Sequence, residues 1–211
     1  MEVNMKFITY SHNYGEEIVL HNNEFQQNWF EIRHALNSIS EEAIVNYFNE
    51  LGDKRGKSLS RAINELLYEK FVELGWFPER PIFNDSRYDG KNHWRLDFAK
   101  DTMSVEVGFN HSGSIAWNLL KPVLASELNH VDKALQTKIG IIITATDELR
   151  DAGGFDNAIG TFSQYVRYLL PLSGKLTTPL IIIGIEAPES FKVIQKKNPQ
   201  RNRWEGYIQY L

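Results

Sequence analysis

The sequence predicts an α/β protein in which a mixed central sheet has helices on both of its faces. Two short apolar runs, residues 138–144 and 179–185, are typical of strands that are buried on both sides. A segment with helical character precedes each run, and an alternating segment at residues 94–111 indicates an antiparallel hairpin. Buried strands with helices before them, next to a hairpin, favour this mixed architecture.

Length and composition predict one folded domain over residues 1–211. The chain has 211 residues, of which 42% are hydrophobic and 24% charged, as is typical of a globular protein. It contains no cysteine, which excludes disulfides, a thiolate nucleophile and a cysteine-ligated zinc site. No apolar run approaches the roughly 20 residues that span a bilayer, and residues 1–10 lack the features of a signal peptide. We therefore expect a cytoplasmic protein with no membrane partner.

The elements before the hairpin are one strand and three helices. Ser40, followed by Glu41 and Glu42, predicts an N-cap with acids in the first turn, and Gly75 predicts a helix end. The expected elements are a strand at residues 6–20, helices at 24–36 and 40–51, a loop at 52–58 and an amphipathic helix at 59–74.

The elements after the hairpin alternate between helices and the two buried strands. Residues 113–131 form an expected helix that Pro122 interrupts, and residues 155–170 form another. Residues 146–157 are expected to be a loop at the end of a buried strand, a position where functional groups are common.

The hairpin is predicted to place two carboxylates opposite each other. With a tight turn at Asp101 and Thr102, Asp97 faces Glu106, Phe98 faces Val105 and Leu96 faces Val107. One face of the hairpin is then apolar and the other carries the acids. Facing side chains lie roughly 5 Å apart, where two unit charges repel by about 3 kcal/mol at an effective dielectric constant of about 20.

A bound cation would remove this repulsion, and hard divalent ions prefer carboxylate and carbonyl oxygens. The sequence thus favours a magnesium site built from Asp97, Glu106 and a strand carbonyl. Ser104 and Gly108 leave the acidic face uncrowded, as a cleft for a large polyanion requires. The alternative is a solvent-facing hairpin whose acids point into water.

Other catalytic signatures are weak. Glu65 lies on the helix before the hairpin, either as an ordinary exposed acid or as a third acidic group that binds water around a metal. The histidines have no spacing typical of zinc ligands, and no P-loop, GxGxxG motif or nucleophile elbow is present.

Polar residues after Glu106 are candidates for reading DNA bases or for capping a helix. They are Asn110, His111, Ser112 and Ser114. The 146–157 loop adds Arg150, Asp151 and Asn157.

The charge is unevenly distributed along a chain whose net charge is -4. Residues 1–51 are strongly acidic, whereas residues 192–203 contain no acid and several bases: Lys192, Lys196, Lys197, Arg201 and Arg203. This basic segment is either a strap that contacts phosphates or a solvated loop.

Most of the chain resembles type II restriction endonucleases of the BglII and BstYI kind, within the PD-(D/E)XK nuclease fold. The resemblance rests on ITYSH, INELLYEKFVELGW, DFAKDTMSVEVGF, KIGIIIT and PLIIIGIEAP. It implies a restriction-endonuclease-like sheet and a homodimer on a short palindromic duplex, each subunit cutting one strand with Mg²⁺. It also implies sites that contain GATC and 5′ overhangs after cleavage.

By position, the resemblance makes Asp97 and Glu106 metal ligands, Val107 a carbonyl ligand and Glu65 an auxiliary acid. Lys121, Arg150, Arg201 and Arg203 join the polar residues after Glu106 as expected DNA contacts.

The chain departs from the family pattern where a glutamine or lysine helps to orient the attacking water. Gly108 stands at this position. Either Arg95, His111, Lys121 or the substrate phosphate replaces the missing group, or cleavage is impaired. If position 108 lacks a functional group in this way, Gly108→Gln is expected to preserve or raise activity. The competing hypotheses are a catalytically impaired DNA-binding homologue and a protein unrelated to DNA.

Overall fold

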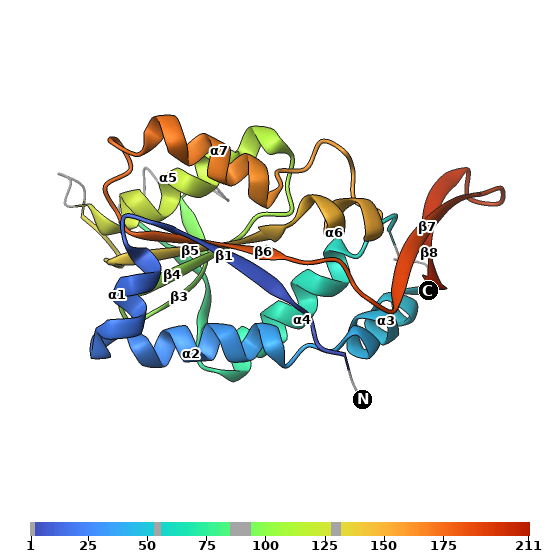
Figure 1. Cartoon of the computed structure of the whole chain (residues 1–211), viewed down its shortest axis with the longest axis horizontal. Helices are drawn as coiled ribbons and strands as arrows, with labels where there is room; N and C mark the ends of the chain where they lie inside the picture. Colours follow the sequence, from blue (N-terminus) through green and yellow to red (C-terminus); the bar gives the residue numbers. More distant parts are fainter. Residues whose placement is uncertain (1–2, 53–55, 85–93, 128–131) are drawn as a thin grey trace.

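The computed structural model describes residues 3–52, 56–84, 94–127 and 132–211. Its six-stranded sheet has the order β1-β6-β5-β4-β3-β2 (Figure 1). Strands β4, β5 and β6 are parallel to one another, whereas β1, β2 and β3 pair in antiparallel fashion, which confirms the predicted mixed sheet. The strands are β1 (Phe7–His12), β2 (Phe77–Pro81), β3 (Arg95–Lys100), β4 (Met103–Val107), β5 (Ile139–Ala145) and β6 (Leu180–Ile185).

Helices cover both faces of this sheet, as predicted. Helices α5 (Ile115–Ser126) and α7 (Phe162–Leu172) lie on one face, and α2 (Asn23–Asn37) and α4 (Ser60–Glu73) lie on the other (Figure 1). Every residue of β5 and β6 is buried. On β5, Ile142 packs with α5 and α7, while Ile141 and Ile143 pack with the α2 and α4 side, so alternate side chains serve two cores.

The N-terminal strand is shorter than the predicted strand at residues 6–20. Strand β1 ends at His12 because Asn13 and Tyr14 have φ angles of 50° and 60°, which interrupt an extended chain. Helix α1 (Gly15–His21) follows. Gly15 packs so closely on β6 that a Cβ there would lie 2.7 Å from the Leu180 carbonyl oxygen.

The next helices agree with the sequence. Helix α3 (Glu41–Glu50) begins at the predicted cap, where the Ser40 hydroxyl accepts the Ala43 N–H at 3.1 Å. Helix α4 buries its predicted apolar stripe, and Gly75 follows with a φ of 80°. Strand β2 was not predicted because Pro78 and Pro81 are unusual in strands. It is tolerated at the edge of the sheet.

In the C-terminal half, three helices differ from those predicted from the sequence. A short 3-10 helix (Ser112–Ser114) precedes α5, which ends at Ser126, and the rest of the predicted 113–131 helix includes residues outside the described part. The expected 146–157 loop contains α6 (Asp147–Ala152). Helix α7 begins at Phe162 rather than at residue 155, because Phe155 packs against Phe109 and Thr161 forms the N-terminal capping box.

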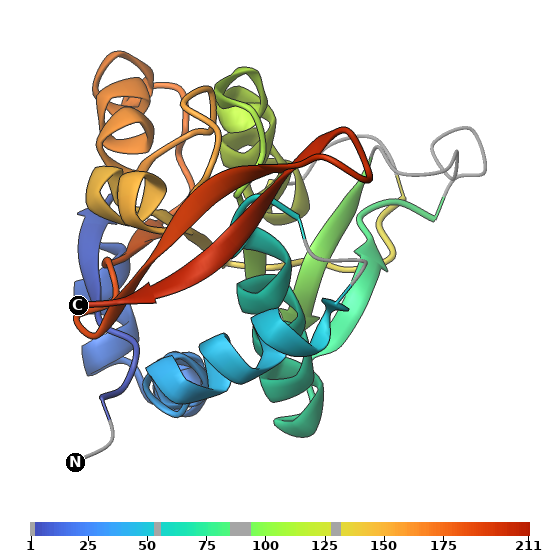
Figure 2. The same cartoon turned by 90° about the vertical axis from the view of Figure 1, so that its right-hand side faces the viewer.

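The basic segment forms part of a separate hairpin. Strands β7 (Phe191–Asn198) and β8 (Arg203–Tyr210) pair with each other and lie beyond the end of the layered core (Figures 1 and 2). The hairpin is anchored where the Gly206 N–H donates to the Gly56 carbonyl and the Gln195 amide donates to the Gly154 carbonyl. None of the helices in the described ranges is long and apolar enough to cross a bilayer.

Candidate active site

The β3–β4 hairpin has the predicted register and turn. Phe98 pairs with Val105 and Lys100 with Met103, and the turn at Asp101 and Thr102 places Asp101 at a φ of 49°. The Asp101 carboxylate accepts a hydrogen bond from Asn28 of α2 at 3.1 Å, which ties the turn to the helical layer.

Beyond the Phe98–Val105 pair, the carboxylates of Asp97 and Glu106 form hydrogen bonds between β3 and β4 in place of the regular backbone pairs. Asp97 Oδ2 accepts the Val107 N–H at 2.7 Å, and Glu106 Oε1 accepts the Asp97 N–H at 3.3 Å. Each carboxylate is therefore fixed by the backbone of the opposite strand. The structure thus brings Asp97 and Glu106 together as the sequence predicts.

The predicted single apolar face of the hairpin is wrong. Phe98 packs in the larger core with Phe71, whereas Leu96 packs in a separate cluster with Ile82 and Ala99. The alternation of side chains between the two faces of β3 changes at Asp97. This residue lies beside Glu79 of β2, whose φ angle of 51° departs from extended geometry. Leu96 also lies outside the recorded β3–β4 pairs, so the predicted Leu96–Val107 pair does not form part of that ladder.

The acidic face is covered rather than open, so the expected uncrowded cleft is also wrong at this point. Ser104 and Glu106 are buried, with relative exposures of 0% and 1%. Asp97 is half-buried. Burial and the neighbouring Asp97 charge raise the pKa of Glu106 to about 8, although the Lys121 ammonium opposes the shift. Burial also raises the pKa of Asp97, while the Val107 N–H and Lys121 favour its charged form.

Helix α5 supplies the cation that faces this pair. Lys121 Nζ lies 2.6 Å from Glu106 Oε2, and the lysine side chain is largely buried at 17% exposure. The Glu106 carboxyl group consequently contacts both the Asp97 N–H and the Lys121 ammonium. This charge compensates part of the cost of burying two adjacent acids.

The donor set fits a hard divalent cation. Two neighbouring carboxylates and the nearby Val107 carbonyl offer the oxygen ligands that Mg²⁺ prefers, and water can complete its coordination. Among the described residues, no three acidic or histidine side chains gather into a metal-binding group. Glu65 is not part of such a cluster and lies 4.0 Å from Arg61 of its own helix, so its auxiliary role stays a prediction.

Gly108 is enclosed by two buried polar side chains. A Cβ at this position would lie 2.3 Å from Tyr165 Oη and 2.9 Å from Asn118 Nδ2. Asn118 Nδ2 donates to Tyr165 Oη at 2.6 Å, so the two side chains hold each other in place. A side chain at position 108, including that of Gly108→Gln, would therefore require Tyr165 and Asn118 to shift. The expected effect of Gly108→Gln on activity stays a prediction.

Sequence reasoning missed Asn118 and Tyr165. Both occupy buried positions of amphipathic helices, where their spacing matches that of ordinary core residues. Their proximity to Gly108 arises because α5 and α7 pack on the same face of the sheet.

The three proposed substitutes for the missing group have different environments. Arg95 lies beyond the β3–β4 ladder and donates to the Glu79 carbonyl at 3.0 Å. His111 is exposed, and its Nδ1 accepts the Gly113 N–H at 3.1 Å in a local cap. Lys121 contacts Glu106 directly.

The polar segment after β4 lies beside the loop before α7. The Ser112 N–H donates to the Ala158 carbonyl, and the Gly160 N–H donates to the Asn110 carbonyl. Asn110 is exposed, while Ser112 and Ser114 are half-buried. The segment is therefore supported by a second loop and presents polar side chains at the end of the strand that carries Glu106.

The predicted basic contacts are engaged with acids in this structure. On α6, Arg150 forms ion pairs with Asp147 at 3.0 Å and Asp151 at 2.8 Å. On the β7–β8 hairpin, Arg203 lies 2.9 Å and Arg201 3.7 Å from the buried Glu205 carboxylate. Asn157, in contrast, is an exposed loop residue.

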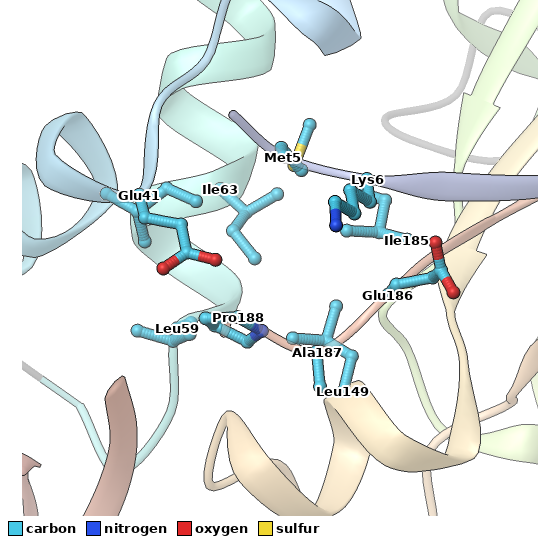
Figure 3. A pocket seen from close by; sticks show the side chains of 11 residues that line it. Met5, Lys6, Glu41, Leu59, Ile63, Leu149, Ile185, Glu186, Ala187 and Pro188 are labelled. Atoms are coloured by element: carbon cyan, nitrogen blue, oxygen red, sulfur yellow. The ribbon is translucent and has the colours of Figure 1, made fainter. Parts of the chain in front are cut away.

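A small apolar pocket lies elsewhere, between the residues just before β1, helices α4 and α6 and the end of β6 (Figure 3). Its volume is about 10 Å³, with Ile63 and Leu149 among the lining residues. Glu41 also lines it, but its carboxylate accepts the backbone N–H groups of Glu189 and Ser190. The pocket has room for about one water molecule, and Glu41 has a structural role there.

Comparisons with known proteins agree with this arrangement of the sheet and its helices. The family model described as restriction endonuclease BglII/BglIII matches residues 7–185, and the chain belongs to this family. It is therefore of the class of sequence-specific DNA endonucleases, which are hydrolases that generally depend on a divalent metal.

Two solved structures share the fold. The crystal structure of restriction endonuclease BglII complexed with a DNA 16-mer has a TM-score of 0.63 at 19% identity and covers 98% of this chain and 100% of that chain. Free BglII has a TM-score of 0.55 at 17% identity, with the same coverage. No match was found among curated protein sequences.

Proposed function

We propose that this protein is a Mg²⁺-dependent type II restriction endonuclease that cuts both strands of a short palindromic DNA site. The observation that carries the proposal is the reciprocal pair of Asp97 and Glu106 on adjacent strands. Family membership supports DNA as the substrate. A GATC-containing site and 5′ overhangs are the expected specificity, on the basis of the resemblance to BglII and BstYI.

In this mechanism, Asp97, Glu106 and the Val107 carbonyl would hold Mg²⁺. The bound cation would activate water and stabilise charge on the scissile phosphate. The Val107 N–H fixes the Asp97 carboxylate, and the Asp97 N–H fixes that of Glu106, so both are oriented before substrate arrives. Glu65 is proposed as an auxiliary group that binds water.

The DNA would lie across the end of β4. Asn110, His111, Ser112 and Ser114 lie in a segment that follows the acids directly and could reach base edges. Lys121, Arg150, Arg201 and Arg203 would contact phosphates, and for the last three this requires partial release from their carboxylate partners. Two copies of the chain would match the symmetry of a palindromic site.

The first experiment is to incubate the purified protein with a long natural DNA at low salt, with and without Mg²⁺. Discrete fragments that require Mg²⁺ are expected, and the sequences of their ends would identify the site and the overhang. Sedimentation of the protein with a duplex containing that site should give two chains per duplex.

A catalytically impaired DNA-binding homologue is the second candidate, and Gly108 favours it because a glycine has no side chain to orient water. It would shift the same DNA in a gel and leave it intact in Mg²⁺. Such a result from a folded protein would replace the endonuclease proposal.

A further inference from the structure

We propose that Lys121 performs the water-orienting role for which Gly108 lacks a side chain, and that Asn118 and Tyr165 are positioning residues that hold α5 in place for it. This inference rests on the proposed endonuclease function and names a further catalytic residue for it. Two residues at the end of β4 lie opposite two residues of helix α5. Glu106 of β4 faces Lys121 of α5, and Gly108, which directly follows β4, faces Asn118 of the same helix.

The residue spacing along a strand and along a helix explains why both pairs form. Residues two apart on a strand lie on the same face and about 7 Å apart, and residues three apart on a helix are neighbours about 5–6 Å apart. When Asn118 rests against the Gly108 backbone, Lys121 on the next turn reaches Glu106. A larger residue at 108 would push the helix away from the strand and withdraw the ammonium.

Two further contacts fix the helix close to the sheet. Tyr165 of α7 accepts a hydrogen bond from Asn118 at 2.6 Å, which links α5 to the neighbouring helix. Pro122 packs against Gly140 of β5, where a Cβ would lie 2.4 Å from the Pro122 Cβ atom. The glycines at 108 and 140 thus allow α5 to approach the sheet on either side of Lys121.

The Lys121 ammonium can donate the hydrogen bonds that orient the attacking water. It has more than one N–H donor, and the recorded contact with Glu106 Oε2 uses one. In the reaction, another N–H would donate to the attacking water, and a further one to a non-bridging phosphate oxygen. The water oxygen forms a bond to phosphorus while the P–O ester bond breaks. One proton passes from the water to solvent, the leaving oxygen takes one from solvent, and Lys121 stays protonated throughout.

The test compares Lys121→Met and Lys121→Gln with the parental protein. Single-turnover cleavage is expected to fall about 100-fold or more in Lys121→Met, the usual effect of losing one oriented donor. It should fall less in Lys121→Gln, because an amide can still donate. Lys138→Met is the matched control, since Lys138 is an exposed lysine paired with Glu24. It should cut at the parental rate.

Two further readouts distinguish a catalytic role from a structural one. Affinity for the cleavage site, measured with Ca²⁺ in place of Mg²⁺, should change only a few-fold. At a pH high enough to ionise Glu106 in both proteins, the calorimetric Mg²⁺ affinity of Lys121→Met should equal or exceed that of the parent, because the competing ammonium is gone. Thermal unfolding identifies a misfolded variant, in which case Lys121→Gln carries the test.

Parental cleavage by a folded Lys121→Met or Lys121→Gln would overturn this inference and leave the endonuclease function intact. Loss of Mg²⁺ binding in these variants at the same high pH would also overturn it, because the lysine would then support the metal site itself. If the parental protein cuts no DNA, the proposed function fails, and this inference fails with it.

Discussion

The Asp97 and Glu106 carboxylates each accept a backbone N–H from the opposite strand of the β3–β4 hairpin, Asp97 from Val107 and Glu106 from Asp97. The Asp97 bond to Val107 is 2.7 Å long and the Glu106 bond to Asp97 is 3.3 Å. The hairpin thereby fixes two acids next to each other. Two negative charges held this close together would favour the binding of a cation.

Asp97→Asn should abolish cleavage while site-specific DNA binding persists. The amide keeps the shape of the side chain but removes the negative charge that would hold Mg²⁺. The expected loss in single-turnover rate is about 1,000-fold or more, equivalent to about 4 kcal/mol in the activation free energy. Gel shifts in Ca²⁺ would follow binding, and cleavage at the parental rate would refute the assignment of Asp97.

Mg²⁺ affinity should rise with pH and level off above about 8. Burial and the Asp97 charge raise the pKa of Glu106 to about 8, so below this pH its carboxyl group must release a proton to bind a cation. The affinity should increase by up to about tenfold per pH unit in that range. Calorimetry in two buffers with different ionisation enthalpies would measure the released proton. A constant Mg²⁺ affinity below pH 8 would contradict this assignment.

Gly108→Ala should destabilise the protein by about 1–3 kcal/mol, the usual cost of overpacking a buried site. The added methyl group would meet the Tyr165 hydroxyl at 2.3 Å and the Asn118 amide at 2.9 Å. Tyr165→Phe removes the closest atom and should recover part of the loss.

A double-mutant cycle with denaturant unfolding would measure this coupling, which we expect to be about 1 kcal/mol. Gly174→Ala is the control, because a Cβ at Gly174 meets no atom within 4 Å. Additive effects of Gly108→Ala and Tyr165→Phe would show that the hydroxyl does not limit the space at Gly108.

Arg201→Ala should weaken DNA binding at specific and non-specific sites alike. If Arg201 contacts one phosphate, the slope of log affinity against log salt should decrease in magnitude by about 1. Lys70→Ala on α4, where Lys70 pairs with the nearby Glu73, is a control for losing one positive charge. An unchanged salt dependence in Arg201→Ala would place this part of the β7–β8 hairpin away from the DNA.

Local patterns predicted much of the sheet and the acid pair. The apolar runs of β5 and β6 required burial on both faces, and the alternation of β3 and β4 with a turn at Asp101 set their register. Predictions failed where tertiary contacts override local pattern. Helix α7 begins later than expected because Phe155 packs against Phe109, and the alternation at Leu96 changes beside the positive φ of Glu79.

Strand periodicity and turn geometry act over a few residues, so the mixed α/β class and the proximity of Asp97 and Glu106 could be predicted from the sequence. The enclosure of Gly108 by Asn118 and Tyr165, and the contact between Lys121 and Glu106, depend on tertiary packing. These groups come from α5 and α7, whose approach to β4 depends on the packing of whole helices on the sheet. The spacing of these residues along the chain does not indicate how closely the helices approach the sheet.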